Sequence, residues 1–135
     1  RKILPFVIID KRKDNTLVGM SSYTNISYAD KRIEIGWSWL GVRYQGTGIN
    51  GIYKRVLVKY AFEKLGFVRV EFKTDVLNKQ ARKALLKIGA VEEGILRSHT
   101  QMHSNRRRDT IYYGIIKDEW EILHLRPHDI DNVAG

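Results

Sequence analysis

The feature that most constrains this chain is a strand, a glycine-rich turn and a helix that follow one another within residues 32–66. Over residues 33–40 bulky apolar side chains alternate with smaller or polar ones, a period of two that is typical of a strand with two different faces. The bulky set is Ile33, Ile35, Trp37 and Trp39, and the residues that alternate with them are Glu34, Gly36, Ser38 and Leu40. We therefore expect one side that faces the core and an opposite side that carries one carboxylate beside open space.

The run after the glycines has the pattern of an amphipathic helix that Gly66 ends. Its apolar residues recur at the spacing of three and four that places side chains on one face of a helix. The predicted buried stripe consists of Ile52, Tyr53, Val56, Leu57, Tyr60, Ala61 and Leu65. The residues that fall outside this stripe are Lys54, Arg55, Lys59, Glu63 and Lys64.

The turn between this strand and this helix, residues 41–51, contains four glycines. Glycines at the start of a helix let the backbone approach a phosphate closely, and the free N–H groups there can hold its charge. A pyrophosphate is the natural ligand for such a turn. The alternative is a tight turn that needs glycine only for its dihedral angles. The glycine spacing matches neither the Rossmann dinucleotide fingerprint nor the Walker A loop.

Gln45, Gly48 and Asn50 carry a resemblance to a known family. Their spacing resembles motif A of the GCN5-related N-acetyltransferases (the GNAT superfamily), except that Asn50 stands where the motif has Gly or Ala. Further short matches follow the order of the RimJ/RimL-like branch, and the resemblance covers about residues 3–121. They are Ile33 to Trp37, Arg69 to Glu71, Thr74-Asp75, Asn78, Gly89-Ala90, Glu93-Gly94, Arg108 to Thr110 and Glu119-Trp120.

The resemblance implies the acyl-CoA N-acyltransferase fold, an α/β (α+β) arrangement with a mixed, mostly antiparallel sheet flanked by helices. The residue patterns agree, because they predict three strands, a helix, a strand, a helix, two strands and a short helix that Pro127 limits. The expected strands are 4–9, 16–28, 33–40, 68–75, 91–101 and 110–116, and the longer helices are 52–65 and 78–88. Family members carry one more strand and two more helices before these elements. Residues 1–135 are therefore expected to be one GNAT domain with an incomplete N-terminal part.

The resemblance also implies acetyl-CoA as the acyl donor and co-substrate. The backbone N–H groups of residues 46–50 would hold its pyrophosphate, Arg43 and Gln45 would flank it, and the main chain at the end of the central strand would pair with the pantetheine arm. Asn78 would contact the same arm through its amide, or would only cap the second helix. The implied donor-binding residues are Trp39, Leu40, Arg43, Gln45, Gly46, Thr47, Gly48, Ile49, Asn50 and Asn78.

Glu34 is the expected general base, because it lies on the sparsely filled face and matches a carboxylate common in this branch. The alternative is a structural or salt-bridged carboxylate. The group that protonates the leaving thiolate is not evident, since Leu85 stands where many acetyltransferases have a tyrosine and Ala81 where RimL-like sequences have a serine. Water, Tyr112 or Tyr113 would have to serve.

The charge and composition exclude several other classes. The formal net charge of +9 and the basic clusters would suit nucleic acid, but no nucleic-acid-binding module is recognisable, and the same charge suits the phosphates of coenzyme A. The chain has no cysteine, so a catalytic Cys is excluded. No apolar run is long enough for a membrane span, and we expect a cytoplasmic protein. We expect no metal site, and the histidines, His99, His103, His124 and His128, are interpreted as surface residues.

The prediction is therefore an enzyme, an acetyl-CoA-dependent N-acetyltransferase of the RimJ/RimL type that works by direct attack in a ternary complex. The acceptor is a primary amine, either a protein N-terminus such as that of a ribosomal protein or a small molecule. A non-catalytic acyl-CoA-binding or interaction module of the same fold is the alternative. Nucleic acid is not the expected partner, and a homodimer remains open.

Overall fold

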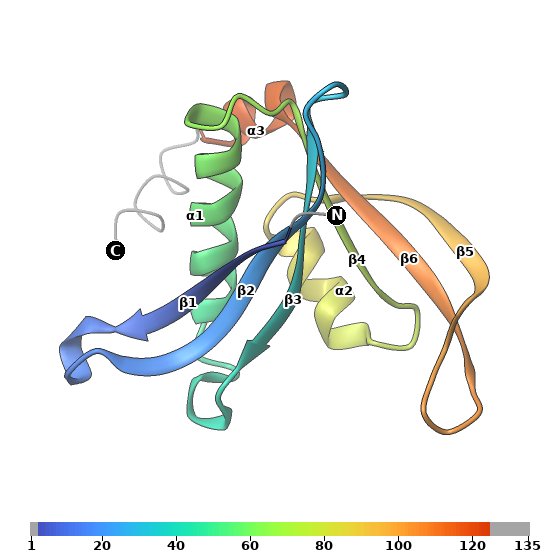
Figure 1. The fold of residues 1–135 in the computed structure, drawn as a ribbon, viewed down its shortest axis with the longest axis horizontal. Coiled ribbons are helices and arrows are strands. Elements are labelled where there is room, and N and C mark those ends of the chain that lie inside the picture. The colour runs from blue at the N-terminus through green and yellow to red at the C-terminus, as the bar shows by residue number, and fades with distance from the viewer. Residues whose placement is uncertain (1–2, 125–135) are drawn as a thin grey trace.

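A computed structural model of the protein describes residues 3–124. Six strands form one sheet in the order β1-β2-β3-β4-β6-β5 (Figure 1). The strands are β1 (Leu4–Asp10), β2 (Thr16–Ser27), β3 (Arg32–Leu40), β4 (Arg69–Asp75), β5 (Val91–Gln101) and β6 (Arg107–Ile116). The helices are α1 (Ile49–Glu63), α2 (Lys79–Lys87) and α3 (Lys117–His124), with single 3-10 turns η1 (Lys11–Lys13) and η2 (Val42–Tyr44).

Neighbouring strands pair antiparallel throughout, except for the central pair β3 and β4, which is parallel. Helix α1 makes the crossover between these two strands, and α2 connects β4 to β5. This mixed, mostly antiparallel sheet with helices confirms the predicted fold class. Pro127 and His128 lie outside the described residues, and among those described no helix is both long and apolar enough to cross a membrane.

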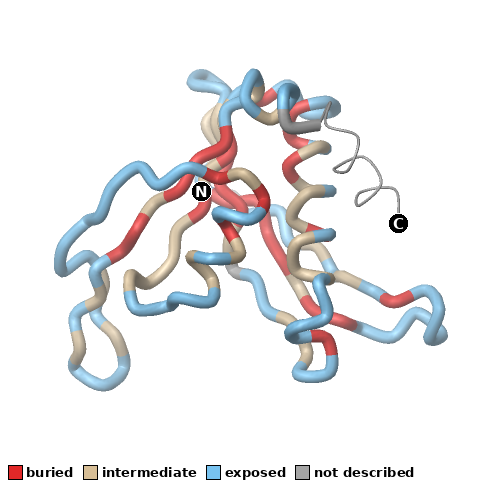
Figure 2. The backbone as a smooth tube through the Cα atoms, turned by 180° about the vertical axis from the view of Figure 1, so that it is seen from behind, coloured by how far each residue is buried: buried red, intermediate tan, exposed pale blue. Residues whose placement is uncertain are grey.

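One hydrophobic core joins α1 and α2 to the same side of the sheet. It brings together residues from both helices and from strands β2, β3, β4 and β6. Figure 2 shows buried positions concentrated in the central strands, whereas α1 is mostly of intermediate burial and the hairpin tips are exposed. The members are Tyr23, Ile33, Ile35, Val58, Ala61, Phe62, Phe67, Val70, Phe72, Leu85, Ile88, Ala90, Ile111, Tyr113 and Ile115.

The buried stripe of α1 differs from the one predicted. The helix buries Tyr53, Val58, Ala61 and Phe62, whereas Ile52, Val56 and Tyr60 of the predicted stripe are 40%, 52% and 47% exposed. Apolar residues occur almost all round this helix, so periodicity alone could not select the face that packs on the sheet. The helix also begins earlier than predicted, at Ile49, with Gly48 as its N-cap.

A bulge in β3 overturns the strict alternation expected for that strand. Met20 pairs with Trp39 and Ser22 with Gly36, so β3 has one more residue than β2 between these two pairs. Beyond the bulge Ser38 faces α1, with its Oγ 2.7 Å from Ser21 Oγ, rather than sharing the face of Glu34. Trp39 is 48% exposed, so the prediction that it packs in the core is wrong. The side chain of Trp37 lies outside the described part of the structure.

The parallel pairing of β3 with β4 is short. It joins Arg32 to Arg69, Ile33 to Val70 and Glu34 to Glu71, and it ends there although β3 continues to Leu40 and β4 to Asp75. The two strands diverge beyond this point (Figure 1). The two strand backbones therefore form a V whose apex is the Glu34–Glu71 pair, and we refer to this V between the strands as the cleft.

Candidate active site

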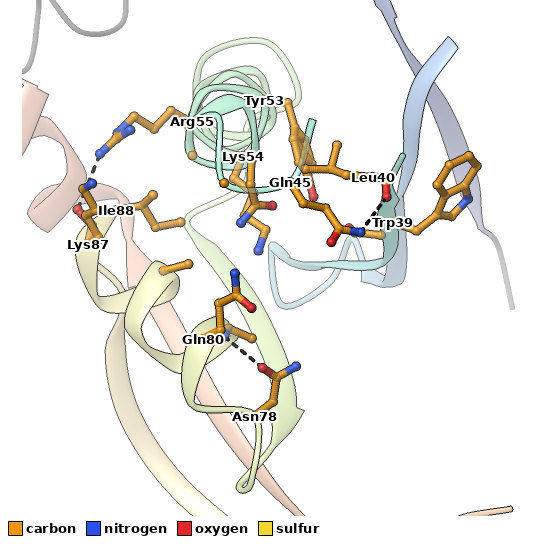
Figure 3. Close-up of a pocket in the computed structure, with 17 residues that line it drawn as sticks. Trp39, Leu40, Gln45, Tyr53, Lys54, Arg55, Asn78, Gln80, Lys87 and Ile88 are labelled. Atoms are coloured by element: carbon orange, nitrogen blue, oxygen red, sulfur yellow. Dashed lines mark hydrogen bonds between the residues drawn. The ribbon is translucent and has the colours of Figure 1, made fainter. Parts of the chain in front are cut away.

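A cavity of about 500 Å³ lies on the helix side of this cleft. The end of β3, the glycine turn, the first two turns of α1 and the facing side of α2 form its walls (Figure 3). It is lined by Ser38, Trp39, Leu40, Gln45, Gly46, Gly48, Asn50, Gly51, Tyr53, Lys54, Arg55, Asn78, Gln80, Ala81, Ala84, Lys87 and Ile88.

The glycine turn presents the N-terminus of α1 to this cavity. Gly46 and Gly48 have φ angles of +75° and +87°, and a Cβ at either position would meet only open space. Glycine is therefore required there for its dihedral angles, and nothing in the fold fills the space in front of it. No side chain caps the helix, which leaves the first N–H groups of α1 directed at the cavity. A helix start of this kind binds anions.

The side chains of the cavity add positive charge to that of the helix N-terminus. Lys54, Arg55 and Lys87 line it, and none of the described lining residues is an Asp or a Glu. Burial lowers the pKa of Lys54 from its usual 10.5 to about 8, which shows a cation held without a compensating carboxylate. The cavity therefore has a net positive charge that would attract an anion.

The opposite face of the cleft has a different chemistry. Glu34 is only 2% exposed; its Oε1 accepts a hydrogen bond of 2.9 Å from Asn25 Nδ2, and its Oε2 lies 3.5 Å from Lys73 Nζ. A shallow cavity on this face is lined by Asn25, Ile26, Ser27, Arg32, Glu34, Glu71 and Tyr112. Glu34 thus lies at the apex of the cleft, among polar groups.

Two buried side-chain oxygens on this face, Glu34 Oε2 and Thr24 Oγ1, lack hydrogen-bond partners. A Cβ added to Gly36 would lie 3.2 Å from the first and 3.7 Å from the second. Gly36 therefore keeps open one small space that both oxygens face, and a single water there could bond to each of them.

The family model of the acetyltransferase (GNAT) domain matches residues 1–91. The chain belongs to the GNAT acetyltransferase family. The provisionally named ribosomal N-acetyltransferase YdaF of Bacillus subtilis is 35% identical over 80% of this chain and 58% of its own length. The chain spans between 58% and 63% of the length of the three curated relatives it matches.

Solved structures show the same fold. A GCN5-related N-acetyltransferase from Brucella melitensis superposes with a TM-score of 0.83 and 29% identity, over 89% of this chain and 53% of that one. A mutant of the spermidine N-acetyltransferase SpeG from Vibrio cholerae superposes with a TM-score of 0.80 over 87% of this chain and 68% of that one. Its 21% identity supports the fold alone.

Most of the residues predicted to bind the donor in this GNAT domain line the helix-side cavity. They are Trp39, Leu40, Gln45, Gly46, Gly48, Asn50 and Asn78. Gln45 Nε2 donates a 3.1 Å hydrogen bond to Leu40 O, which closes the turn onto the end of β3. Arg43, Thr47 and Ile49 are not among the lining residues: Arg43 is exposed on η2, and Thr47 Oγ1 is hydrogen-bonded to Tyr44 O.

The expectations for Asn78 and the two tyrosines have different outcomes. Asn78 Oδ1 caps α2 by accepting a 3.0 Å hydrogen bond from Ala81 N, which leaves its amide nitrogen for a ligand. The hydroxyl of Tyr113 lies 3.2 Å from both Arg82 Nε and Glu92 Oε1, away from the cavity. Tyr112 lines the opposite face with Glu34.

Sequence reasoning missed the cations of the cavity. Lys54 and Arg55 follow the glycine turn within the first two helical turns, and this position could have signalled that they face the same ligand as the turn. Lys87 comes from the last turn of α2, and only the packing of α2 beside α1 brings it close, as the 3.5 Å contact between Arg55 Nη2 and Lys87 O shows. Among residues 3–124 no group of three or more His, Cys, Asp or Glu side chains is placed to hold a metal.

Proposed function

We propose that this chain is an acetyl-CoA-dependent N-acetyltransferase that transfers the acetyl group to a primary amine by direct attack. One observation carries the proposal: a cationic cavity at a helix N-terminus lies beside the end of β3, and a buried carboxylate, Glu34, lies where the pairing of β3 with β4 ends. GNAT proteins use acetyl-CoA. The bound donor supplies an acyl thioester, and the remaining chemistry falls to the residues of the protein.

The first turn of α1 would hold the diphosphate of the donor. Backbone N–H groups of residues 48–51 supply donors, and Gly46 and Gly48 allow a close approach because nothing occupies the space beside them. Arg55 and Lys87 lie along the same cavity and would neutralise further phosphate charge.

The free edge of β3 would hold the extended arm of the donor. Beyond Glu34 this edge is not paired with β4, so its backbone groups remain available to a strand-like ligand. At about 3.3 Å per residue, the stretch from Glu34 to Leu40 is about 20 Å long. An extended arm of that length would reach from the glycine turn to the apex of the cleft, where Glu34 lies.

Glu34 would take the proton of the acceptor amine. Its Oε1 is fixed by Asn25, while Oε2 faces the open space beside Gly36. A water in that space, bonded also to Thr24 Oγ1, would relay the proton between the amine and the carboxylate. Lys73 Nζ lies 3.5 Å from Oε2 and helps to hold the carboxylate in place.

The acceptor is proposed to be a protein N-terminus, such as that of a ribosomal protein, or a small-molecule amine. The name of the Bacillus subtilis relative supports the first of these. Incubation with acetyl-CoA and a panel of amines and N-terminal peptides, with release of coenzyme A as the readout, would identify the class.

The donor site is tested by Gly48→Val, with Gly66→Val as a matched control. Both glycines have positive φ, +87° and +76°, and open space around the missing Cβ, but Gly66 follows the other end of α1. Both substitutions strain the backbone in the same way. Only Gly48→Val places a side chain between a phosphate and the helix N-terminus. We expect it to abolish coenzyme A binding in calorimetry and the control to bind normally. Equal affinities in two folded variants would refute the diphosphate assignment.

A non-catalytic acyl-CoA-binding module is the second candidate. Ala81, which stands where RimL-like sequences have a serine, lines the cavity, and Leu85 is buried in the core. No hydroxyl from α2 therefore reaches the donor. A module of this kind would bind coenzyme A in calorimetry but release none from acetyl-CoA with any amine of the panel.

A further inference from the structure

Lys54 occupies a position that the proposed function leaves unused. Its side chain extends from α1 toward β4, and Nζ lies 5.9 Å from the centre of the Phe72 ring. Phe72 directly follows Glu71, the residue at which the pairing of β3 with β4 ends. The amino group is therefore near the apex of the cleft, on the face opposite to the cavity that Glu34 lines. In Figure 3 it lies in the middle of the cavity, between α1 and α2.

We propose that Lys54 stabilises and protonates the thiolate that leaves during acyl transfer. This role rests on the proposed function. The neutral amine bonds to the thioester carbonyl carbon, the C–S bond breaks, and its electron pair remains on sulfur. Sulfur then takes a proton from Nζ, while the proton lost by the acceptor passes to Glu34. Solvent returns a proton to the neutral Lys54, so no other reactant is required.

The other titratable groups of the cavity do not suit this role. A guanidinium does not serve as a proton donor in proteins, which excludes Arg55. Burial raises the pKa of Tyr53, whose hydroxyl is engaged by Ser38 and Ser21, so it is a weaker acid turned toward β2 and β3. Lys87 lies at the last turn of α2, beside Arg55.

Among the described lining residues of the cavity, those that come from strands add no competing acid. Ser38, Trp39 and Leu40 of β3 line the cavity and do not titrate in this range. On β4, Glu71 and Lys73 alternate with Phe72 and belong to the opposite face, where Lys73 pairs with Glu34. Lys54 thus remains the group near the apex that can give up a proton.

The acidity of Lys54 fits the leaving group. Burial lowers its pKa to about 8, close to the value of about 8.5 for an ordinary thiol. Proton transfer between two groups of similar pKa is nearly balanced, which favours general acid catalysis. At pH 7 most of Lys54 still carries the proton that it would donate.

Lys54 also has a predictable effect on stability. Its pKa is lower in the folded protein than in the unfolded chain, so burial of its charge opposes folding in full below pH 8, and this penalty fades as the pH rises toward 10.5. We expect Lys54→Met to melt at a higher Tm than wild type at pH 7, with the gain shrinking between pH 8 and 10.5. A gain or loss in Tm that is independent of pH would show that Lys54 is not a desolvated cation, and would overturn the proposal.

The direct test measures the pKa of the thiol of coenzyme A bound to the protein. The ultraviolet absorbance of the thiolate is recorded as a function of pH. A cation within about 4–6 Å of a thiol lowers its pKa by roughly one to three units. We expect such a shift in wild type and its loss in Lys54→Met. Lys54→Arg should retain the shift but lower kcat, because the guanidinium holds its proton. Lys59→Met, which removes a cation of α1 that does not line the cavity, should leave the shift unchanged.

Two results would overturn this role. One is an equal thiol pKa for coenzyme A bound to wild type and to Lys54→Met. The other is an acetyl group on Lys54, found by mass spectrometry after incubation with acetyl-CoA, because the amine would then lie at the carbonyl carbon rather than at sulfur. Calorimetry separates these failures from that of the proposed function, since a wild-type protein that does not bind coenzyme A refutes the donor site itself.

Discussion

The two faces of the cleft differ in how their charges are balanced, although the same two strands form both. On the helix face, none of the ion pairs in the described part involves Lys54, Arg55 or Lys87. On the opposite face each carboxylate has a cation: Lys73 lies 3.5 Å from Glu34 and Arg69 3.1 Å from Glu71.

This difference indicates what each face needs from outside. The helix face has positive charge and free N–H groups, and an anionic ligand would complete it. The carboxylates Glu34 and Glu71 are already paired with cations, so this face does not require a further charged ligand. Under the proposed function, a thioester held from the helix face and an amine held from the Glu34 face would meet beside the Glu34–Glu71 pair.

The largest expected effect comes from Glu34→Gln, which removes the base and leaves the helix face intact. A general base contributes about 10²–10⁴-fold, so kcat should fall by roughly that factor while the Kd of acetyl-CoA stays the same. The deficit should narrow as the pH rises, because the acceptor amine then loses its proton without help.

Glu71→Gln is the matched control for Glu34→Gln. Glu71 pairs with Glu34 across the strands and lines the same shallow cavity, so its removal changes the charge of this face by the same amount. We expect a loss of less than about tenfold, as for a partly exposed ion pair. Similar losses of kcat for the two variants would show that kcat depends on the total charge of this face rather than on one carboxylate. Glu34 would then not be the base.

Thr24→Val tests the relay on the Glu34 face and should have a smaller effect. It keeps the shape of the side chain and removes the hydroxyl that faces the space beside Gly36. Loss of one hydrogen bond to the relay water should lower kcat by about tenfold, and Thr24→Ser should restore it. Coenzyme A affinity should not change. If Thr24→Val retains full activity and melts at a higher Tm, the hydroxyl is an unsatisfied group and no relay water is present.

Substitutions of Asn78 should have the smallest effect. They separate its two proposed roles, as a ligand of coenzyme A and as the N-cap of α2. Asn78→Ser keeps an N-cap for α2 but removes the amide nitrogen, so stability should change by only a few tenths of a kcal/mol. Coenzyme A affinity should fall about twofold to fivefold, as expected for one neutral hydrogen bond. Asn78→Ala should in addition cost about 1 kcal/mol of unfolding free energy. An unchanged affinity in Asn78→Ser would mean that Asn78 is a cap alone.

Some predictions made from the sequence were accurate because they concern short-range chemistry. Gly48 has a positive φ at the helix start, and Asn78 caps α2. Strand boundaries agree within a few residues, although β6 begins at Arg107 rather than at residue 110. In each case the local sequence contains the physical cause, whether a dihedral preference, a capping group or an alternation of side chains.

Other features depended on contacts between distant segments. The bulge in β3 exists because of its pairing with β2, and it turned Ser38 toward α1 and left Trp39 half exposed. The rotation of α1 moved Lys54 from the expected solvent side into the cavity. Neither change leaves a signal in the local pattern, since β3 alternates regularly in sequence and α1 is apolar on more than one side.

By itself, the sequence determined the family, the order of the elements and the glycine turn at the start of α1, because these depend on glycine and capping residues acting within a few positions. Only the tertiary structure decided which side chains meet at the apex of the cleft. Lys54, Phe72 and Glu34 come from three elements, and their arrangement depends on where the pairing of β3 with β4 ends and on how α1 is rotated against the sheet. Both follow from packing over the whole core, and no single segment of the sequence contains the information that decides them.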